Sequence, residues 1–148
     1  AIDSGVSHSL ILKSDGSLWA FGNQDQGRLG VPRYGHRNNP SMVVESGVVD
    51  ISAGGNHSLF VKNDGSVWAM GHNGYGQLGM EKSGDNNWPV RILESSASSV
   101  EASRNSFSFV VMKDGSLLGF GRDDDAQLGT GRMIRTHIPV TVAERIAE

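Results

Sequence analysis

The chain has 148 residues, enough for one domain with a single hydrophobic core. Hydrophobic residues make up 37% of it and the mean hydropathy is -0.29, which favours a soluble globular protein, and no apolar run reaches the roughly 18 residues that a membrane-spanning helix needs. With 13 basic and 16 acidic residues the formal net charge is -3, which argues against a broad phosphate-binding surface, and the lack of cysteine excludes disulfides, thiol nucleophiles and thiolate metal sites.

The chain consists of three copies of one pattern. Its clearest marker is an Asp-Gly pair, found as Asp15-Gly16, Asp64-Gly65 and Asp114-Gly115, so that the copies are 49 and 50 residues apart. The copies span approximately residues 1–47, 48–97 and 98–148. A fixed period of this length is typical of repeat architectures in which neighbouring units share a core.

Each copy predicts four short strands, which are clearest in the second copy. The first strand covers residues 48–53 and the second covers 57–62. A turn at Asp64-Gly65 leads into the third strand, 66–70, since Asp-Gly tolerates the positive φ that a tight hairpin needs. A glycine-rich loop and an irregular segment precede the fourth strand, 90–93. Apolar side chains alternate onto both faces, so we predict an all-β fold of four-stranded propeller blades.

The third copy departs from the pattern at three positions. Arg104 replaces the glycine found at Gly5 and Gly54, Phe107 replaces a histidine, and Leu118 replaces a tryptophan. The combined pattern nevertheless covers essentially the whole chain: His-Ser-Leu, Asp-Gly, Trp-Ala-x-Gly, Gly-x-Leu-Gly and then proline. This pattern resembles the repeat of the regulator of chromosome condensation family, whose members are β-propellers. The resemblance implies a ring that presents loops to a protein partner.

Three blades do not close a propeller, which normally has four to eight. Two hypotheses follow from the whole number of repeats. A second copy of the chain could join it head to tail to form a homodimeric six-bladed ring, or the chain could be part of a longer propeller. The sequence does not separate the two.

Several residue patterns suggest chemistry but have simpler structural interpretations. His8 and His57 precede serines, yet neighbours on a strand point to opposite faces, so we predict that the imidazoles bind backbone near the glycine turns. The acidic run 122–125 lacks the twelve-residue loop of a calcium site and is predicted to be a solvated turn. We therefore predict no catalytic residue, no metal and no cofactor. The recurring residues are assigned structural roles: His8, His57, Asp15, Gly16, Asp64, Gly65, Asp114, Gly115, Trp19 and Trp68.

The segments 31–39, 80–88 and 130–138 have equal length but differ in nearly every residue. A rigid frame that displays variable contacts would show this pattern. They contain residue types that anchor protein interfaces, and we predict that these form a binding surface for a protein partner: Arg33, Tyr34, Arg37, Trp88, Arg132 and Arg135. Nucleic acid is a less favoured partner because the chain is acidic.

The preferred function is therefore a non-enzymatic protein-interaction scaffold. One alternative, implied by the family resemblance alone, is a guanine-nucleotide exchange factor for a small GTPase. Another is an enzyme with a pocket at the centre of the propeller, which would need acid–base groups that the repeat does not place there.

Overall fold

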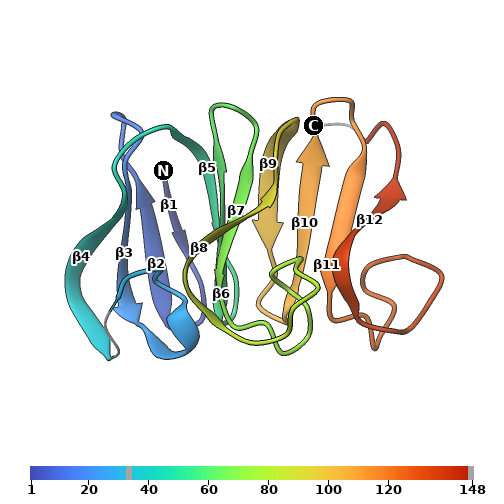
Figure 1. Cartoon of the computed structure of the whole chain (residues 1–148), viewed down its shortest axis with the longest axis horizontal. Coiled ribbons are helices and arrows are strands. Elements are labelled where there is room, and N and C mark those ends of the chain that lie inside the picture. The colour runs from blue at the N-terminus through green and yellow to red at the C-terminus, as the bar shows by residue number, and fades with distance from the viewer. Residues whose placement is uncertain (33–34, 147–148) are drawn as a thin grey trace.

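The computed structural model describes residues 1–32 and 35–146, and these form three four-stranded antiparallel sheets (Figure 1). Blade 1 contains β1 (Ile2–Ser4), β2 (His8–Leu12), β3 (Leu18–Asn23) and β4 (His36–Val44). Blade 2 contains β5 (Val48–Ala53), β6 (His57–Lys62), β7 (Val67–Gly71) and β8 (Asn86–Leu93). Blade 3 contains β9 (Ala97–Ala102), β10 (Phe107–Met112), β11 (Leu117–Gly121) and β12 (Thr136–Ala143). The all-β propeller architecture predicted from the repeat is confirmed.

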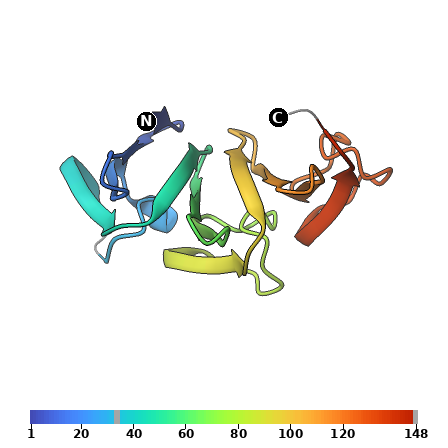
Figure 2. The same ribbon diagram turned by 90° about the horizontal axis from the view of Figure 1, so that it is seen from above.

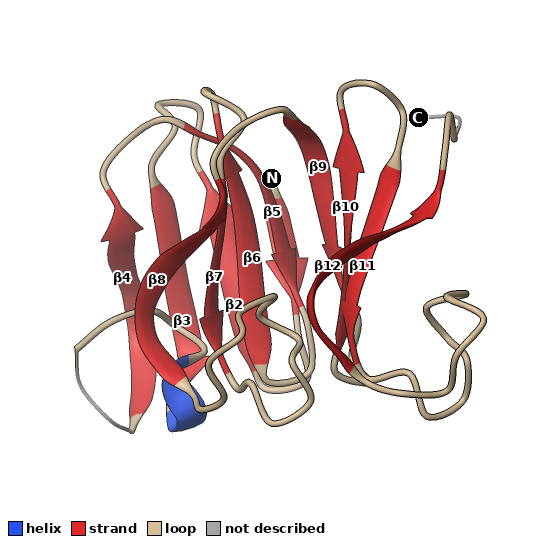
Figure 3. Cartoon of the chain, turned by 45° about the vertical axis from the view of Figure 1, so that its right-hand side comes forward, coloured by secondary structure: helices blue, strands red, loops and turns tan. Residues whose placement is uncertain are grey.

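Within each blade the strands are paired in chain order, from the first strand to the fourth. Viewed from above, the blades fan around an open arc, with β4, β8 and β12 on its outer side (Figure 2). Among the described residues the only helical element is a single 3-10 turn, Asp25–Gly27, which lies below blade 1 (Figure 3). No helix in the described part of the chain is long and apolar enough to cross a membrane.

The central hairpin of each blade is built around its Asp-Gly turn. Gly16, Gly65 and Gly115 have φ values of +82°, +81° and +87°, which a residue with a side chain rarely adopts. In blade 1, Asp15 Oδ1 accepts hydrogen bonds from the Ser17 hydroxyl at 2.6 Å and the Ser17 amide at 2.9 Å. These bonds, above all the one from the hydroxyl, lower the pKa of the Asp15 carboxyl. The turn is thus closed by its own side chains.

The fourth strands are longer than the sequence predicted. The fourth strand of the second copy begins at Asn86 rather than at residue 90, and Pro40, Pro89 and Pro139 lie inside β4, β8 and β12 rather than at their starts. Proline is compatible with these positions because the fourth strand is the edge of its sheet, where an amide need not donate to a neighbour. The ends of the predicted irregular segments therefore belong to strands.

The hydrophobic core lies between blades rather than within them. One cluster joins blades 1 and 2 and includes Leu10, Leu18, Phe60 and Met70, all of them fully buried. A second cluster joins blades 2 and 3 around Leu59, Val110 and Phe120. Because each sheet is covered by its neighbour, the blades depend on one another for burial.

Candidate protein-interaction face

The two ends of the blades carry different kinds of connection. The described parts of the loops between the third and fourth strands, residues 24–32, 72–85 and 122–135, lie at one end, which we call the long-loop end. The Asp-Gly hairpins lie at the opposite end, which we call the hairpin end (Figure 1). The long-loop end is where the repeats differ most in sequence.

A buried polar side chain pins each long loop from inside. Gln24, Asn73 and Asp123 occupy the same repeat position and are at most 2% exposed. Each accepts a hydrogen bond from a leucine amide five residues later, over distances of 2.9 to 3.0 Å. The same side chains also bind the far side of their loops, as in Thr130 Oγ1, which donates to Asp123 Oδ2 at 2.7 Å. The prediction of a solvated turn was wrong for Asp123, because this carboxylate organises the loop from within.

The long loops of one blade also pack against the fourth strand of the next. A Cβ built on Gly27 would lie 2.4 Å from the carbonyl oxygen of Asn86, and one on Gly76 would lie 2.8 Å from that of Thr136. Only glycine fits such an approach. In blade 3 the equivalent residue is Ala126, with φ of 58°. The loops of blades 1 and 2 are therefore fixed from both sides, by their own polar side chain and by the following blade.

An aromatic ring links the loops of blades 2 and 3. The Arg122 and Arg135 guanidinium carbons lie 5.3 and 5.0 Å from the ring centroid of Tyr75. Arg135 Nη1 also donates to the Gly74 carbonyl at 3.1 Å, and Arg122 Nε donates to Asp124 Oδ2 at 3.1 Å. Both arginines are thereby held in place by contacts within the chain.

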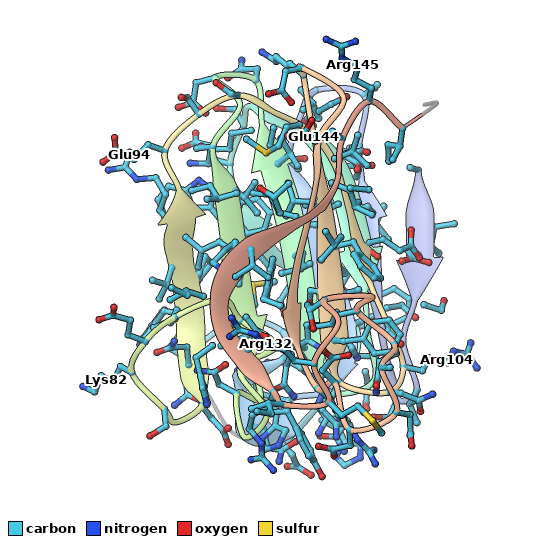
Figure 4. All side chains as sticks on the ribbon, turned by 90° about the vertical axis from the view of Figure 1, so that its right-hand side faces the viewer. Lys82, Glu94, Arg104, Arg132, Glu144 and Arg145 are labelled. Atoms are coloured by element: carbon cyan, nitrogen blue, oxygen red, sulfur yellow. The ribbon has the colours of Figure 1, made fainter. Side chains whose placement is uncertain are left out.

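The loop of blade 3 presents apolar side chains to solvent. Met133 and Ile134 are 65% and 66% exposed and stand between Arg132 and Arg135 in sequence. A pocket of about 250 Å³ adjoins the base of the loop and is lined in part by Thr130, Arg132 and Val140. Arg132 lies on this side of blade 3, towards the long-loop end (Figure 4). The loop joins a fixed base to an apolar tip flanked by positive charge.

The predicted binding residues do not all share one surface element. Arg33 and Tyr34 lie outside the described residues. Arg37 lies in β4, where it is half-buried and its Nε has no hydrogen-bond partner. Trp88 lies in β8 and is 56% exposed. Among the predicted residues that the structure describes, only Arg132 and Arg135 lie on the same loop, so that segment is the best-defined candidate surface.

The repeated histidines bridge adjacent blades. His8 Nε2 lies 2.8 Å from Ser58 Oγ in blade 2, and His57 Nε2 lies 2.8 Å from Ser108 Oγ in blade 3. The sequence predicted a backbone partner near the glycine turns, whereas the partner is a serine hydroxyl one blade further on. The rings also lie against Gly5 and Gly54, where any Cβ would overlap the imidazole.

These His–Ser pairs are not arranged for nucleophilic catalysis. The Ser58 hydroxyl donates to the Arg28 carbonyl at 2.8 Å, and the Ser108 hydroxyl donates to the Gln77 carbonyl at the same distance. Because each hydroxyl has one proton, the histidine must donate its Nε2–H and cannot act as base towards the serine. Burial, followed by repulsion from Arg28, lowers the pKa of His8 to about 4, and burial, followed by repulsion from His8 and His72, lowers that of His57 to about 3.

The repeated tryptophans lie beside the hairpins. Trp19 Nε1 donates to Ser17 Oγ and Trp68 Nε1 donates to Ser66 Oγ, each at 2.9 Å. The Trp68 ring is stacked on Phe60, with the centroids 6.1 Å apart. Leu118, at the equivalent position in blade 3, packs against the cluster between blades 2 and 3.

Carboxylates from all three inner strands lie near one another on the inner side of the arc. Burial, followed by the charges of Asp3 and Asp50, raises the pKa of Glu101. Asp3 Oδ2 accepts a bond from the Ala53 amide at 2.7 Å, and Asp50 Oδ2 accepts one from the Val100 amide at 2.9 Å. Both aspartates thus join a blade to the next one. Among the described residues, no group of three histidine, cysteine, aspartate or glutamate side chains is placed to hold a metal ion.

The pinning residues were missed by sequence reasoning for a simple reason. Gln24, Asn73 and Asp123 differ in type, so identity between repeats does not single them out. Their common signal is position, five residues before the leucine of the Gly-x-Leu-Gly motif or its equivalent, together with the ability of all three side chains to accept a hydrogen bond.

Two sequence models of one family match the chain. Both are described as the regulator of chromosome condensation (RCC1) repeat; one matches residues 15–61 and 64–108, and the other matches residues 1–28 and 48–77. A comparison with curated proteins gives no match.

Solved structures with the same fold include two from yeast and human. The yeast RCC1 protein Prp20 in complex with Kap60 has a TM-score of 0.87 at 21% identity, over 97% of this chain and 37% of that one. Human WBSCR16 has a TM-score of 0.82 at 23% identity, over 96% of this chain and 38% of that one. A second structure of yeast Prp20p, described together with its binding properties to Gsp1p and histones, has a TM-score of 0.87 at 21% identity. The chain thus spans less than two fifths of the length of these relatives.

Proposed function

Because the chain belongs to the family of regulator of chromosome condensation (RCC1) repeats, we propose that it is a protein-binding module whose main contact surface is the segment 130–138 of blade 3, which joins the end of the long loop to the start of β12. The observation that carries this proposal is the exposure of Met133 and Ile134 at 65% and 66% on a loop whose base is pinned to buried Asp123. Exposed apolar side chains on a fixed base are typical of interface anchors, since little conformational freedom is lost on binding.

The flanking charges indicate the chemistry of the partner. Arg135 is held on the Tyr75 ring, and Arg132 borders the pocket at the base of the loop. Guanidinium groups bind carboxylates through paired hydrogen bonds, so the surface suits an acidic segment that carries an apolar anchor. The relatives support a protein partner in general terms: yeast Prp20 is solved in complex with Kap60, and its binding to Gsp1p and histones has been addressed.

A comparison of surface variants tests the proposal. Met133→Ser with Ile134→Ser removes the apolar tip and leaves the loop base intact. Met42→Ser, at a site 49% exposed on β4, is the matched control. We expect the control variant to capture the same proteins as the wild-type chain. The double variant should bind them about tenfold or more weakly. Equal capture by all three forms would contradict the proposal.

The exchange-factor alternative is separated by a second assay. Partners recovered in the capture experiment are identified by mass spectrometry, and any small GTPase among them is loaded with a fluorescent nucleotide. Nucleotide release that accelerates with the concentration of the chain would favour exchange activity over simple binding. Trp88→Ala and Arg132→Ala then show whether β8 or the loop of blade 3 carries the contact.

A further inference from the structure

A second feature lies at the hairpin end, away from the long loops. In blades 1 and 2 an indole N–H donates a hydrogen bond to the hydroxyl oxygen of the hairpin serine. Trp19 Nε1 lies 2.9 Å from Ser17 Oγ, and Trp68 Nε1 lies 2.9 Å from Ser66 Oγ. Both serine hydroxyls have already donated their protons to the aspartate of the turn. The hairpin therefore contains a built acceptor for one N–H donor.

Blade 3 keeps this acceptor but lacks the ring. Ser116 Oγ donates to Asp114 Oδ1 at 2.6 Å, as in the other blades, while Leu118 stands in place of tryptophan. Leu118 is paired in the sheet with Thr141, where blade 2 pairs Trp68 with Arg91. Both replacements remove bulk from the same place beside the hairpin.

A pocket of about 410 Å³ lies at this place, lined by Asp114, Ser116, Thr141, Glu144 and Arg145. Glu144 and Arg145 lie at the hairpin end of blade 3, opposite Arg132 (Figure 4). Backbone geometry contributes to its shape, because Arg145 has φ of 55° and its Cα lies near Gly115.

The charge around the pocket also differs from the other blades. Lys13 Nζ lies 4.0 Å from the ring centroid of Trp19, and Lys62 Nζ lies 4.6 Å from that of Trp68. Met112 replaces this lysine in blade 3. Two carboxylates, Asp114 and Glu144, and one guanidinium remain around the pocket. A ligand that repeats the arrangement of blades 1 and 2 would bring an indole ring together with a cation.

We propose that this pocket binds the side chain of a tryptophan from another protein, next to a basic residue. The indole N–H donates to Ser116 Oγ, the ring fills the space beside Leu118, and the basic group lies near Asp114 and Glu144. Thr141 also borders the pocket beside the segment 130–138, whereas Asp114, Ser116, Glu144 and Arg145 do not, so effects at these four residues separate this proposal from the proposed function.

The probe for this site is N-acetyl-lysyl-tryptophan amide, titrated into isotope-labelled protein and followed by amide chemical shifts. We expect saturable shifts at Ser116 and Glu144, with a dissociation constant on the order of 1 mM, as suits a ligand of this size. N-acetyl-lysyl-leucine amide has neither the indole ring nor its N–H. At equal concentration we expect it to give at most about a tenth of the chemical-shift change, because the contacts of the indole ring are lost.

Variants of the chain decide whether the pocket is responsible. Leu118→Trp fills it from within and is expected to abolish the shifts and to raise the midpoint of thermal unfolding. Ser116→Ala removes the acceptor and is expected to weaken binding about fivefold. Ser66→Ala makes the same change in blade 2, where the place is occupied, and is expected to leave binding unchanged. Shifts that map elsewhere, or equal binding by the Ser116→Ala and Ser66→Ala proteins, would overturn the proposal.

Discussion

At the scale of single residues, the side chains that recur in the repeats form the hydrogen bonds between adjacent blades. His8 and His57 donate to Ser58 and Ser108, which in turn donate to carbonyls in the loops of the preceding blade. Burial holds both imidazoles neutral, with pKa values lowered to about 4 and about 3. Protonation would therefore oppose folding.

We expect the free energy of unfolding to fall as the pH is lowered from about 7 to about 4.5. Unfolded imidazoles, with an ordinary pKa of 6.5, bind protons that the folded ones do not, so stability is lost as the pH falls below 6.5 and continues to fall towards the folded values. His8 alone would contribute about 3 kcal/mol over its full range. Thermal unfolding followed by circular dichroism at several pH values measures this.

The His57→Phe protein is the control for the pH effect, since blade 3 has phenylalanine at this position. It should show a shallower dependence on pH in the same range. The hairpin carboxyls Asp15, Asp64 and Asp114 have lowered pKa values, so their contribution is lost only below about 3.8. A wild-type protein equally stable at both ends of the range would contradict the prediction.

At the scale of elements, glycines set how closely one blade approaches the next. A Cβ on Gly76 would lie 2.8 Å from both the carbonyl oxygen of Thr136 and the Cα of His137. Ala126, the equivalent residue of blade 3, is exposed in the described part of the chain. Gly76 is therefore restricted both by its positive φ and by the neighbouring blade, whereas Ala126 is restricted by its positive φ alone.

We expect Gly76→Ala to destabilise the protein by more than about 2 kcal/mol, because the backbone of β12 cannot yield locally and φ is +82°. Ala126→Gly is the matched control and should change stability by about 1 kcal/mol or less, in the stabilising direction, since alanine is strained at φ of 58°. Urea unfolding of both variants measures the difference, and equal effects would show that only the turn conformation matters.

The elements were predictable from the sequence to different degrees. The hairpins could be predicted because Asp-Gly and alternating apolar residues act locally, within a few residues. The true starts of β4, β8 and β12 could not, since Asn86 and Thr136 become strand residues only through pairing with Gly71 and Gly121. Asp123 looked solvated because its charge is visible in sequence, whereas its partners Leu128 and Thr130 are brought in by the folded loop.

At the scale of the whole molecule, the outward face of blade 3 differs from the faces that form the two junctions. A Cβ on Gly5 would lie 2.2 Å from the Gly54 carbonyl oxygen, and one on Gly54 would lie 2.8 Å from that of Ser103. In blade 3 the equivalent residue is Ser103 rather than Arg104, the residue that the sequence repeat predicted, because this copy has one more residue before Phe107. Phe107 cannot make the histidine bond and packs edge-on against Phe109. This face therefore lacks the glycine and the histidine that make the contacts at the two internal junctions.

The head-to-tail ring formed with a second copy stays a prediction, and this face gives a reason to expect the isolated chain to be monomeric. Blade 1 of another copy would have to pack on Ser103 and Ala126 without the close approach that glycine allows at both internal junctions. We expect light scattering to give the mass of one chain, 15.8 kDa, at micromolar concentration. A stable mass of twice this value would contradict the expectation and support the ring.

The His–Ser bridges, which span 50 and 51 residues, also have a genetic consequence. His8 reaches Ser58 and His57 reaches Ser108, so the donor of one blade and the acceptor of the next always fall at the same repeat positions. Recombination between the DNA segments encoding two blades would remove one repeat in frame, and the loss of residues 48–96 would set His8 opposite Ser108. The glycines Gly5 and Gly27 would likewise meet Ser103 and Thr136, as Gly54 and Gly76 now do. Loss of the second blade by unequal crossing-over would thus leave a junction between blades 1 and 3 with the same kinds of contact as the present junctions.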